Sequence, residues 1–339
     1  MVIAMMLFQY SLRNSISNSW AKHYRYAASY LPKLITDRSL ASMQAAALIC
    51  LHLRNFTKPG GAWFMSNLVL MMCVEMGFHR SVTAWSKTIP EMDPQEIEMR
   101  KRVFWTVLLI HCSVSNKLGR PLAVRLEDFD VELPKALNDH VPAEEPIDDW
   151  HKCSYRVSVY NFKWVLLNIQ VQTSMYSVRA PPHSYELTIQ SLERDLDSFL
   201  KGIPIELSGG PQTAQDDRVC SLYLQFGAQE LSLLIHHPAV CRTTNPDVMN
   251  KNLDICLDAS SKLLKIAAQM RKLKSLDSTW VSATVWLSAM FVTLFTYSQR
   301  KDQMTSSDLS NLKEAMHLWL NIIGDIGQML GRRLFSGPE

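Results

Sequence analysis

A long helix with both ends marked can be read from the sequence between Asp93 and Gly119. Asp93 is a favourable N-cap, and Pro94 suits the first helical position because its missing N–H would have no partner there. Glu96 is placed to complete a capping box, and Gly119 accepts the left-handed conformation that ends many helices. Apolar residues follow Glu96 every three or four positions, which predicts a helix with one buried face.

Similar starts and stops recur along the whole chain, whereas strand patterns are scarce. Ser39 and Asn245 stand where helices are expected to begin, and Gly77 and Gly202 where helices are expected to end. The sequence therefore predicts an all-α fold of about ten helices, arranged as a single large bundle or as a stack of helical hairpins.

Composition suggests how these helices are divided. Residues 1–137 are expected to form an N-terminal helical part, and residues 151–339 a C-terminal helical part packed on it. Between them, residues 138–150 are acidic and contain prolines, which predicts an exposed connection.

The segment Thr279–Ser298 has no formally charged residue over twenty positions. Its length matches a membrane span, but it contains many serines and threonines. A central helix buried on all sides is the interpretation favoured here.

Charge and cysteine usage exclude some functions. The net charge is +3, and the longest basic run, Arg100-Lys101-Arg102, has glutamates one turn earlier, so direct contact with nucleic acid is not expected. The seven cysteines are widely spaced and contain no Cys-x-x-Cys pair, which argues for buried thiols in a reducing compartment and against a zinc cluster. No metal or other cofactor is expected in this chain.

The stretch after Gly119 is a loop rich in charge and bounded by prolines. Arg120 is followed by Glu127, Asp128 and Asp130. These groups are of a kind that serves acid/base catalysis, but carboxylates around an arginine more often hold a loop in place. We therefore predict a structural clamp centred on Arg120, with Arg102 as a second partner.

Eight positions in and before this loop resemble the signature of the fungal-specific transcription factor domain, the middle regulatory region of zinc binuclear cluster regulators. They are Arg102, Trp105, Gly119, Arg120, Pro121, Asp128, Asp130 and Pro134. A second resemblance covers Trp63–Ser81, an apolar helix closing on a Gly-aromatic-His-Arg corner. The chain departs from the family pattern at His111-Cys112, where an Asp-Arg pair is usual.

The resemblance implies a nuclear regulatory region that controls transcription without touching DNA itself. Whether the protein also shuttles between the nucleus and the cytoplasm is left open. Its implied partners are the transcription machinery, another regulator or a small apolar metabolite, and a homodimer is also left open. Zinc is expected only in an upstream DNA-binding domain, so the chain is expected to be either a fragment or a stand-alone relative. Two alternatives remain: an interaction protein that modulates another regulator, and a metabolite-binding protein or enzyme of fungal secondary metabolism on the same scaffold.

Few residues suggest catalysis. His236 and His237 are adjacent, so on a helix their side chains diverge, and no further ligand stands one turn away; helix-end histidines are favoured over a metal site. His111 and Cys112 diverge in the same way and are predicted to pack in the core. The sequence names no catalytic or ligand-binding residue, which favours a function other than catalysis.

Overall fold

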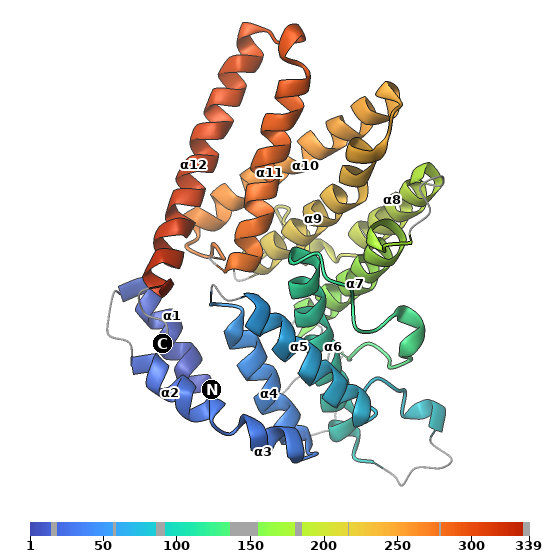
Figure 1. Ribbon diagram of the computed structural model, residues 1–339, viewed down its shortest axis with the longest axis vertical. Helices are drawn as coiled ribbons and strands as arrows, with labels where there is room; N and C mark the ends of the chain where they lie inside the picture. The colour runs from blue at the N-terminus through green and yellow to red at the C-terminus, as the bar shows by residue number, and fades with distance from the viewer. Residues whose placement is uncertain are drawn as a thin grey trace. The chain divides into compact units, whose positions relative to one another are not determined.

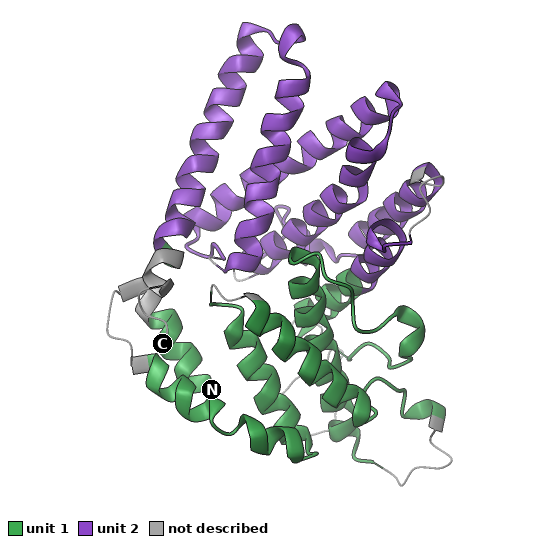
Figure 2. Cartoon of the chain, in the orientation of Figure 1, with its two compact units in different colours: residues 1–165, 329–339 green, residues 166–328 purple. Residues whose placement is uncertain are grey.

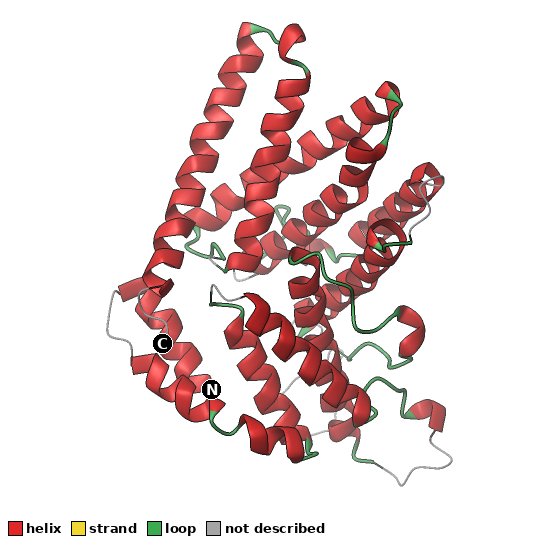
Figure 3. Ribbon diagram, viewed as in Figure 1, coloured by secondary structure: helices red, strands yellow, loops and turns green. Residues whose placement is uncertain are grey.

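The computed structural model describes residues 1–14, 19–56, 59–85, 92–135, 155–179, 185–215, 217–277 and 279–334. All regular structure in these ranges is helical (Figure 3), and this confirms the predicted all-α fold.

The chain divides into two compact units (Figure 2). Unit 1 contains residues 1–165 and 329–339, and unit 2 contains residues 166–328. The division falls inside a helix, α7 (Arg156–Val171). The predicted acidic connection, residues 138–150, lies outside the described residues, so a division of the sequence there stays a prediction.

Unit 1 holds the N-terminal helices, coloured blue to green in Figure 1. They are α1 (Val2–Asn14), α2 (Ser19–Ala28), α3 (Leu31–Thr36), α4 (Leu40–Leu53), α5 (Pro59–Glu75), η1 (Thr83–Trp85), α6 (Pro94–Lys117), η2 (Leu126–Asp128) and the first part of α7. Helices α4, α5 and α6 pack on one another. The apolar face of α6 supplies fully buried side chains, including Phe104 and Leu108, to this core.

Unit 2 begins with the end of α7 and the π-helical turn η4 (Gln172–Tyr176). It continues with α8 (Tyr185–Lys201), η6 (Ile205–Leu207), α9 (Arg218–Arg242), α10 (Pro246–Lys272), α11 (Trp280–Gln299), η7 (Lys301–Gln303) and most of α12 (Ser306–Leu334). Helices α9 and α10 form its most extensive pair.

The predicted helix boundaries rest on local hydrogen bonds. Asp93 caps α6 by accepting from the Gln95 N–H at 3.2 Å, and Ser39 and Asn245 cap α4 and α10 in the same way. After α6, Gly119 has φ +60°, and the N–H of Arg120 donates to the Ser115 carbonyl at 2.9 Å. This is a Schellman ending, and the glycine allows the positive φ that it requires.

Pro238 directly follows the histidine pair, and the sequence predicts a helix stop at His237-Pro238. This prediction is wrong, because α9 continues through Pro238 to Arg242. A proline inside a helix has no N–H for the carbonyl four residues earlier. Here that carbonyl belongs to Leu234, and the Tyr176 hydroxyl donates to it at 2.9 Å. A side chain from η4 thus replaces the missing helical hydrogen bond.

We expect Tyr176→Phe to lower the free energy of unfolding by about 1–3 kcal/mol, since the Leu234 carbonyl would lose the donor that replaces the missing N–H of Pro238. Urea unfolding of the purified chain measures this loss. The matched control is Tyr26→Phe, because Tyr26 is exposed and its hydroxyl contacts the exposed Tyr30 hydroxyl. Equal effects of the two changes would contradict this role of Tyr176.

The prediction that the uncharged segment is buried on all sides is also wrong. Among the described residues, α11 is the one helix long and apolar enough to cross a membrane, and 39% of its apolar window is buried. Trp286 and Ala289 on one face are buried, whereas Phe291 and Phe295 on the opposite face are exposed.

Candidate functional site

The candidate site lies in unit 1, where the loop after α6 meets the corner after α5. We call residues 118–135 the signature loop and residues 76–83 the corner. Gly77 starts the corner with φ +70° in a second Schellman ending, in which the Phe78 N–H donates to the Cys73 carbonyl at 2.9 Å. The chain therefore turns sharply away from α5 toward α6.

Helix α6 holds the corner through Arg100. Its guanidinium donates to the Met76 carbonyl at 2.8 Å and lies over the Phe78 ring, 4.6 Å from the centroid. The carbonyl belongs to the last turn of α5, where acceptors lack helical partners. Arg100 therefore joins the end of one helix to the middle of the next.

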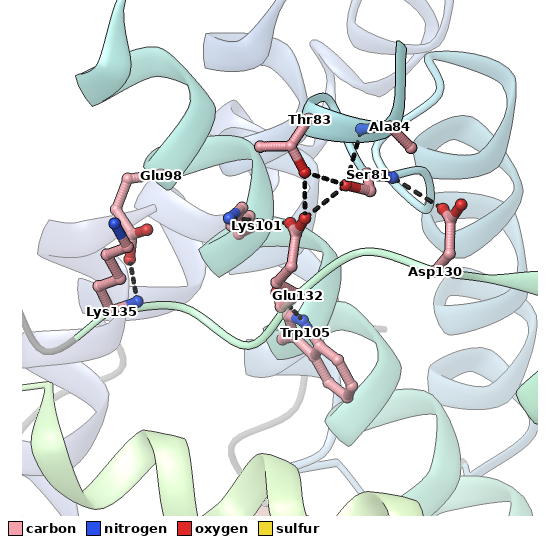
Figure 4. Close-up of polar contacts among 9 residues, drawn as sticks. All are labelled: Ser81, Thr83, Ala84, Glu98, Lys101, Trp105, Asp130, Glu132 and Lys135. Atoms are coloured by element: carbon pink, nitrogen blue, oxygen red, sulfur yellow. Dashed lines mark hydrogen bonds and ion pairs between the residues drawn. The ribbon is translucent and has the colours of Figure 1, made fainter. Parts of the chain in front are cut away.

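Glu132 is the most densely bonded carboxylate of the signature loop (Figure 4). It accepts from the Thr83 hydroxyl at 2.8 Å and from the Ser81 hydroxyl, and it forms an ion pair with Lys101 of α6 at 2.9 Å. Partial burial alone would raise the pKa of Glu132, but these hydrogen bonds lower it to about 2. The carboxylate is therefore a fixed anion at neutral pH.

Asp130 makes a second connection from the loop to the corner. It accepts from the Ser81 N–H at 2.7 Å and from Arg80 Nε at 3.0 Å, and these hydrogen bonds hold the pKa of Asp130 below its usual range. In return, the N–H groups of Asp130 and Val131 donate to the His79 carbonyl at 3.1 and 3.2 Å. Backbone and side chains thus join the same two segments.

Trp105 fixes the loop against α6. Its indole N–H donates to the Glu132 carbonyl at 3.0 Å, and its buried ring packs on Phe129 and Phe162, with centroid distances of 5.6 and 5.8 Å. Two turns earlier, Glu98 accepts from the Lys135 N–H at 2.8 Å. The end of the loop is therefore held at two points of the helix that lie about two turns apart (Figure 4).

The structure corrects the predicted centre of the clamp. Arg120 lies over the Trp63 ring, 4.4 Å from the centroid, and Asp128, Asp130 and Glu132 bind other groups. Arg102 pairs with Glu98 at 3.3 Å within α6 and lies over the Tyr155 ring, so its role as a second partner of the clamp stays a prediction. Burial raises the pKa of Glu98 despite this pair.

The other signature residues have separate places. Asp128 accepts from the Arg125 N–H at 2.6 Å within the loop, Gly119 provides the turn, Pro134 is buried and Pro121 is exposed. Their grouping as one structural clamp stays a prediction.

Sequence reasoning missed Glu132, Ser81, Thr83 and Lys101, which bind one another. One signal for Glu132 was present: it stands two residues after Asp130, with the buried Val131 between them. In an extended segment such alternation directs both carboxylates to the same side.

His111 and Cys112, the departure from the family pattern, are buried in the core. The Ala123 N–H of the signature loop donates to His111 Nε2 at 3.0 Å, so this nitrogen is the acceptor and Nδ1 carries the proton. Nδ1 then donates to the Ser66 hydroxyl of α5 at 3.2 Å. Burial lowers the pKa of His111 to about 4 and raises the pKa of the Cys112 thiol. A neutral imidazole thus connects α5, α6 and the loop.

The hydrogen bonds and ion pairs described above hold the signature loop to the corner and to α6. Glu98, Asp128, Asp130 and Glu132 each accept hydrogen bonds from groups of the chain, both His111 nitrogens are bonded, and Glu127 is exposed. Within the described ranges, no group of three or more possible ligand side chains is placed to hold a metal ion.

His236 contacts Asn252 at 2.7 Å and Glu193 at 3.4 Å, and it lies inside α9, not at its end as predicted.

The comparisons with known proteins agree with this signature. A model of the fungal specific transcription factor domain matches residues 4–163. Residues 4–163 are therefore similar to the fungal specific transcription factor domain. The match covers α1 to the first half of α7 and therefore the whole site.

Relatives of the chain are fungal transcription regulators. A transcriptional regulatory protein of Schizosaccharomyces pombe is 25% identical over 205 residues, which are 58% of this chain and 24% of the relative. Activator of stress genes 1 of Saccharomyces cerevisiae is 28% identical over 192 residues, 54% of this chain and 19% of the relative. The Pyrrolocin cluster transcription factor of a fungal species is 21% identical over 259 residues, 73% of this chain and 32% of the relative.

The chain spans between about a fifth and a third of the length of these relatives. No solved structure matches it. The domain and its relatives support a role in transcription regulation.

Proposed function

We propose that this chain is a nuclear regulatory region that controls transcription through protein partners and a bound effector, without contacting DNA. The observation that carries the proposal is the set of contacts by which Glu132 holds the signature loop to the corner and to α6, within the residues that the family model matches. The expected partners are the transcription machinery or another regulator, and the expected effector is a small apolar metabolite.

The longest basic run supports the absence of DNA contact. Arg100 is bound to the Met76 carbonyl, Lys101 to Glu132 and Arg102 to Glu98. Phosphate binding requires cations free to replace counterions, and these three are engaged within the chain.

The mechanism follows from the number of connections that meet at one loop. The signature loop holds the corner after α5 to α6 and so fixes how these two helices pack. A partner or effector that binds one arrangement of α5 and α6 more tightly than another shifts the population of the chain toward that arrangement. Loss of the Glu132 connections would change the same equilibrium without any ligand.

A reporter experiment tests the proposal. The chain is fused to an unrelated DNA-binding domain and activation domain, and reporter output is compared with that of the fusion lacking the chain. We expect the chain to lower the output and Glu132→Gln to restore it several-fold, because the neutral amide cannot keep the ion pair with Lys101.

Asp197→Asn is the matched control, since Asp197 pairs with Lys201 at 2.6 Å on the exposed surface of α8. Such surface pairs contribute about 0.3–0.5 kcal/mol, so output should not change. The proposal would be contradicted if reporter output were the same with and without the chain. It would also be contradicted if Glu132→Gln and Asp197→Asn changed the output equally. Immunoblotting confirms equal amounts of the fusions.

A further inference from the structure

The end of helix α9 carries an exposed cysteine beside an exposed histidine. His237 and Cys241 stand four residues apart, and the Cys241 Sγ lies 3.4 Å from His237 Nε2. The prediction that no further ligand stands one turn from the histidine pair is therefore wrong. Cys241 also departs from the predicted burial of the cysteines, because it is exposed.

The separation of the two atoms suits chelation of a metal ion. Zinc binds cysteine sulfur at about 2.3 Å and histidine nitrogen at about 2.0–2.1 Å, and a tetrahedral angle between these bonds places the two ligand atoms about 3.5 Å apart. Residues four positions apart share one face of a helix, so the backbone of α9 holds both side chains at this spacing. The other ring nitrogen of His237, Nδ1, lies farther from the sulfur, at 4.0 Å.

Both groups reach the protonation state that a metal ion requires. Burial and the nearby Arg242 lower the pKa of His237, so its imidazole is neutral at pH 7 and offers a lone pair. In the free chain the thiol donates to this lone pair, and a metal ion that binds the sulfur replaces the thiol proton. Binding should therefore release one proton for each metal ion.

One nearby cation limits the affinity. Arg242 directly follows Cys241, and its guanidinium donates to the Met175 carbonyl at 3.2 Å. Its charge opposes a dication, but the thiolate formed on binding offsets one of the two positive charges of the ion. Two protein ligands are half the set of a structural zinc site, so we expect binding in the micromolar range.

We propose that His237 and Cys241 form a bidentate site for zinc or a divalent cation of similar ligand preference, with water completing the coordination. Exposure of both side chains leaves the remaining positions open to water. The other interpretation of the pair is an S–H···N hydrogen bond at the helix end, which needs no metal. The site goes beyond the regulatory function, and the reporter experiment does not test it.

Titration of the purified, reduced chain with Co²⁺, which takes similar ligands to Zn²⁺, tests the proposal. A thiolate ligand gives a charge-transfer absorption in the near ultraviolet. We expect this absorption to saturate at one ion per chain and to disappear when Zn²⁺ is added. Cys241→Ser should abolish it, and His237→Asn should weaken binding by at least about 10-fold, the lower end of the loss when even a group that only supports a ligand is changed.

Cys220→Ser is the matched control, because Cys220 lies near the start of the same helix, about 25 Å from His237 at 1.5 Å per residue. It should leave the absorption intact. Zinc should also slow alkylation of Cys241 by iodoacetamide roughly 10-fold in the wild-type chain, which keeps the test usable if a variant does not fold.

The proposal would be overturned if the wild-type chain gave no charge-transfer absorption at millimolar Co²⁺ and no protection of Cys241 by zinc. An absorption that withstands Cys241→Ser, with unchanged circular dichroism, would assign the metal to other residues. A loss with Cys241→Ser but not with His237→Asn would overturn the bidentate site, since the thiol alone would then hold the ion.

Discussion

Trp105→Ala should lower the free energy of unfolding of unit 1 by about 3–5 kcal/mol, the range for removing a fully buried tryptophan. Two losses combine in this change. The cavity removes the contacts of the ring with Phe129 and Phe162, and the Glu132 carbonyl loses its indole donor. Since a typical domain is stable by only about 5–15 kcal/mol, we expect the variant to be partly unfolded at 37 °C.

Trp105→Phe separates these two losses. Phenylalanine keeps most of the aromatic contact but has no N–H, so the expected loss is about 1–3 kcal/mol. Urea unfolding followed by circular dichroism gives both values. Phe64→Ala is the control, because Phe64 is 68% exposed on α5, and it should change stability by at most about 0.5 kcal/mol. If Trp105→Phe costs as much as Trp105→Ala, packing is not the main contribution of this residue.

Helix boundaries could be predicted from sequence where a single residue decides them. Asp93, Gly77 and Gly119 act on backbone groups within a few positions of themselves, so local patterns contain the needed information. The stop expected at Pro238 failed because its replacement donor, Tyr176, stands far away in the sequence. The prediction that α11 is buried on all sides failed for a related reason. Composition shows that a helix is apolar, but it does not show how many other helices pack against it.

The same limit explains what was found of the site. The resemblance drew attention to the signature loop and to Asp130, but the partners of Asp130, Arg80 and Ser81, lie some fifty positions earlier. Arg120 has carboxylates close by in sequence, yet a flat guanidinium is also stabilised on an aromatic face, and Trp63 provides one. Proximity in sequence therefore identified the charged groups but not their pairing.

Acid should destabilise unit 1 through His111. Burial lowers the pKa of His111 to about 4 in the folded chain, whereas an unfolded histidine titrates near 6.5. Between these values the unfolded state binds more protons, so the stability due to neutral His111 is fully present above about pH 6.5 and is lost as the pH falls toward 4. The loss is on the order of 3 kcal/mol. Its structural cause is the protonation of Nε2, which then cannot accept from the Ala123 N–H.

Comparison with His111→Gln isolates this contribution, because burial also lowers the pKa of His52 to about 4 and thus adds a similar slope in both proteins. Glutamine offers an amide oxygen near the position of Nε2 but does not titrate. We expect the variant to be less stable than wild type at pH 7, and the difference to shrink as the pH falls toward 4. His317→Gln, on the exposed side of α12, should leave the wild-type curve unchanged. Parallel curves for wild type and His111→Gln would show that the buried imidazole is not what couples proton binding to the packing of α5, α6 and the signature loop.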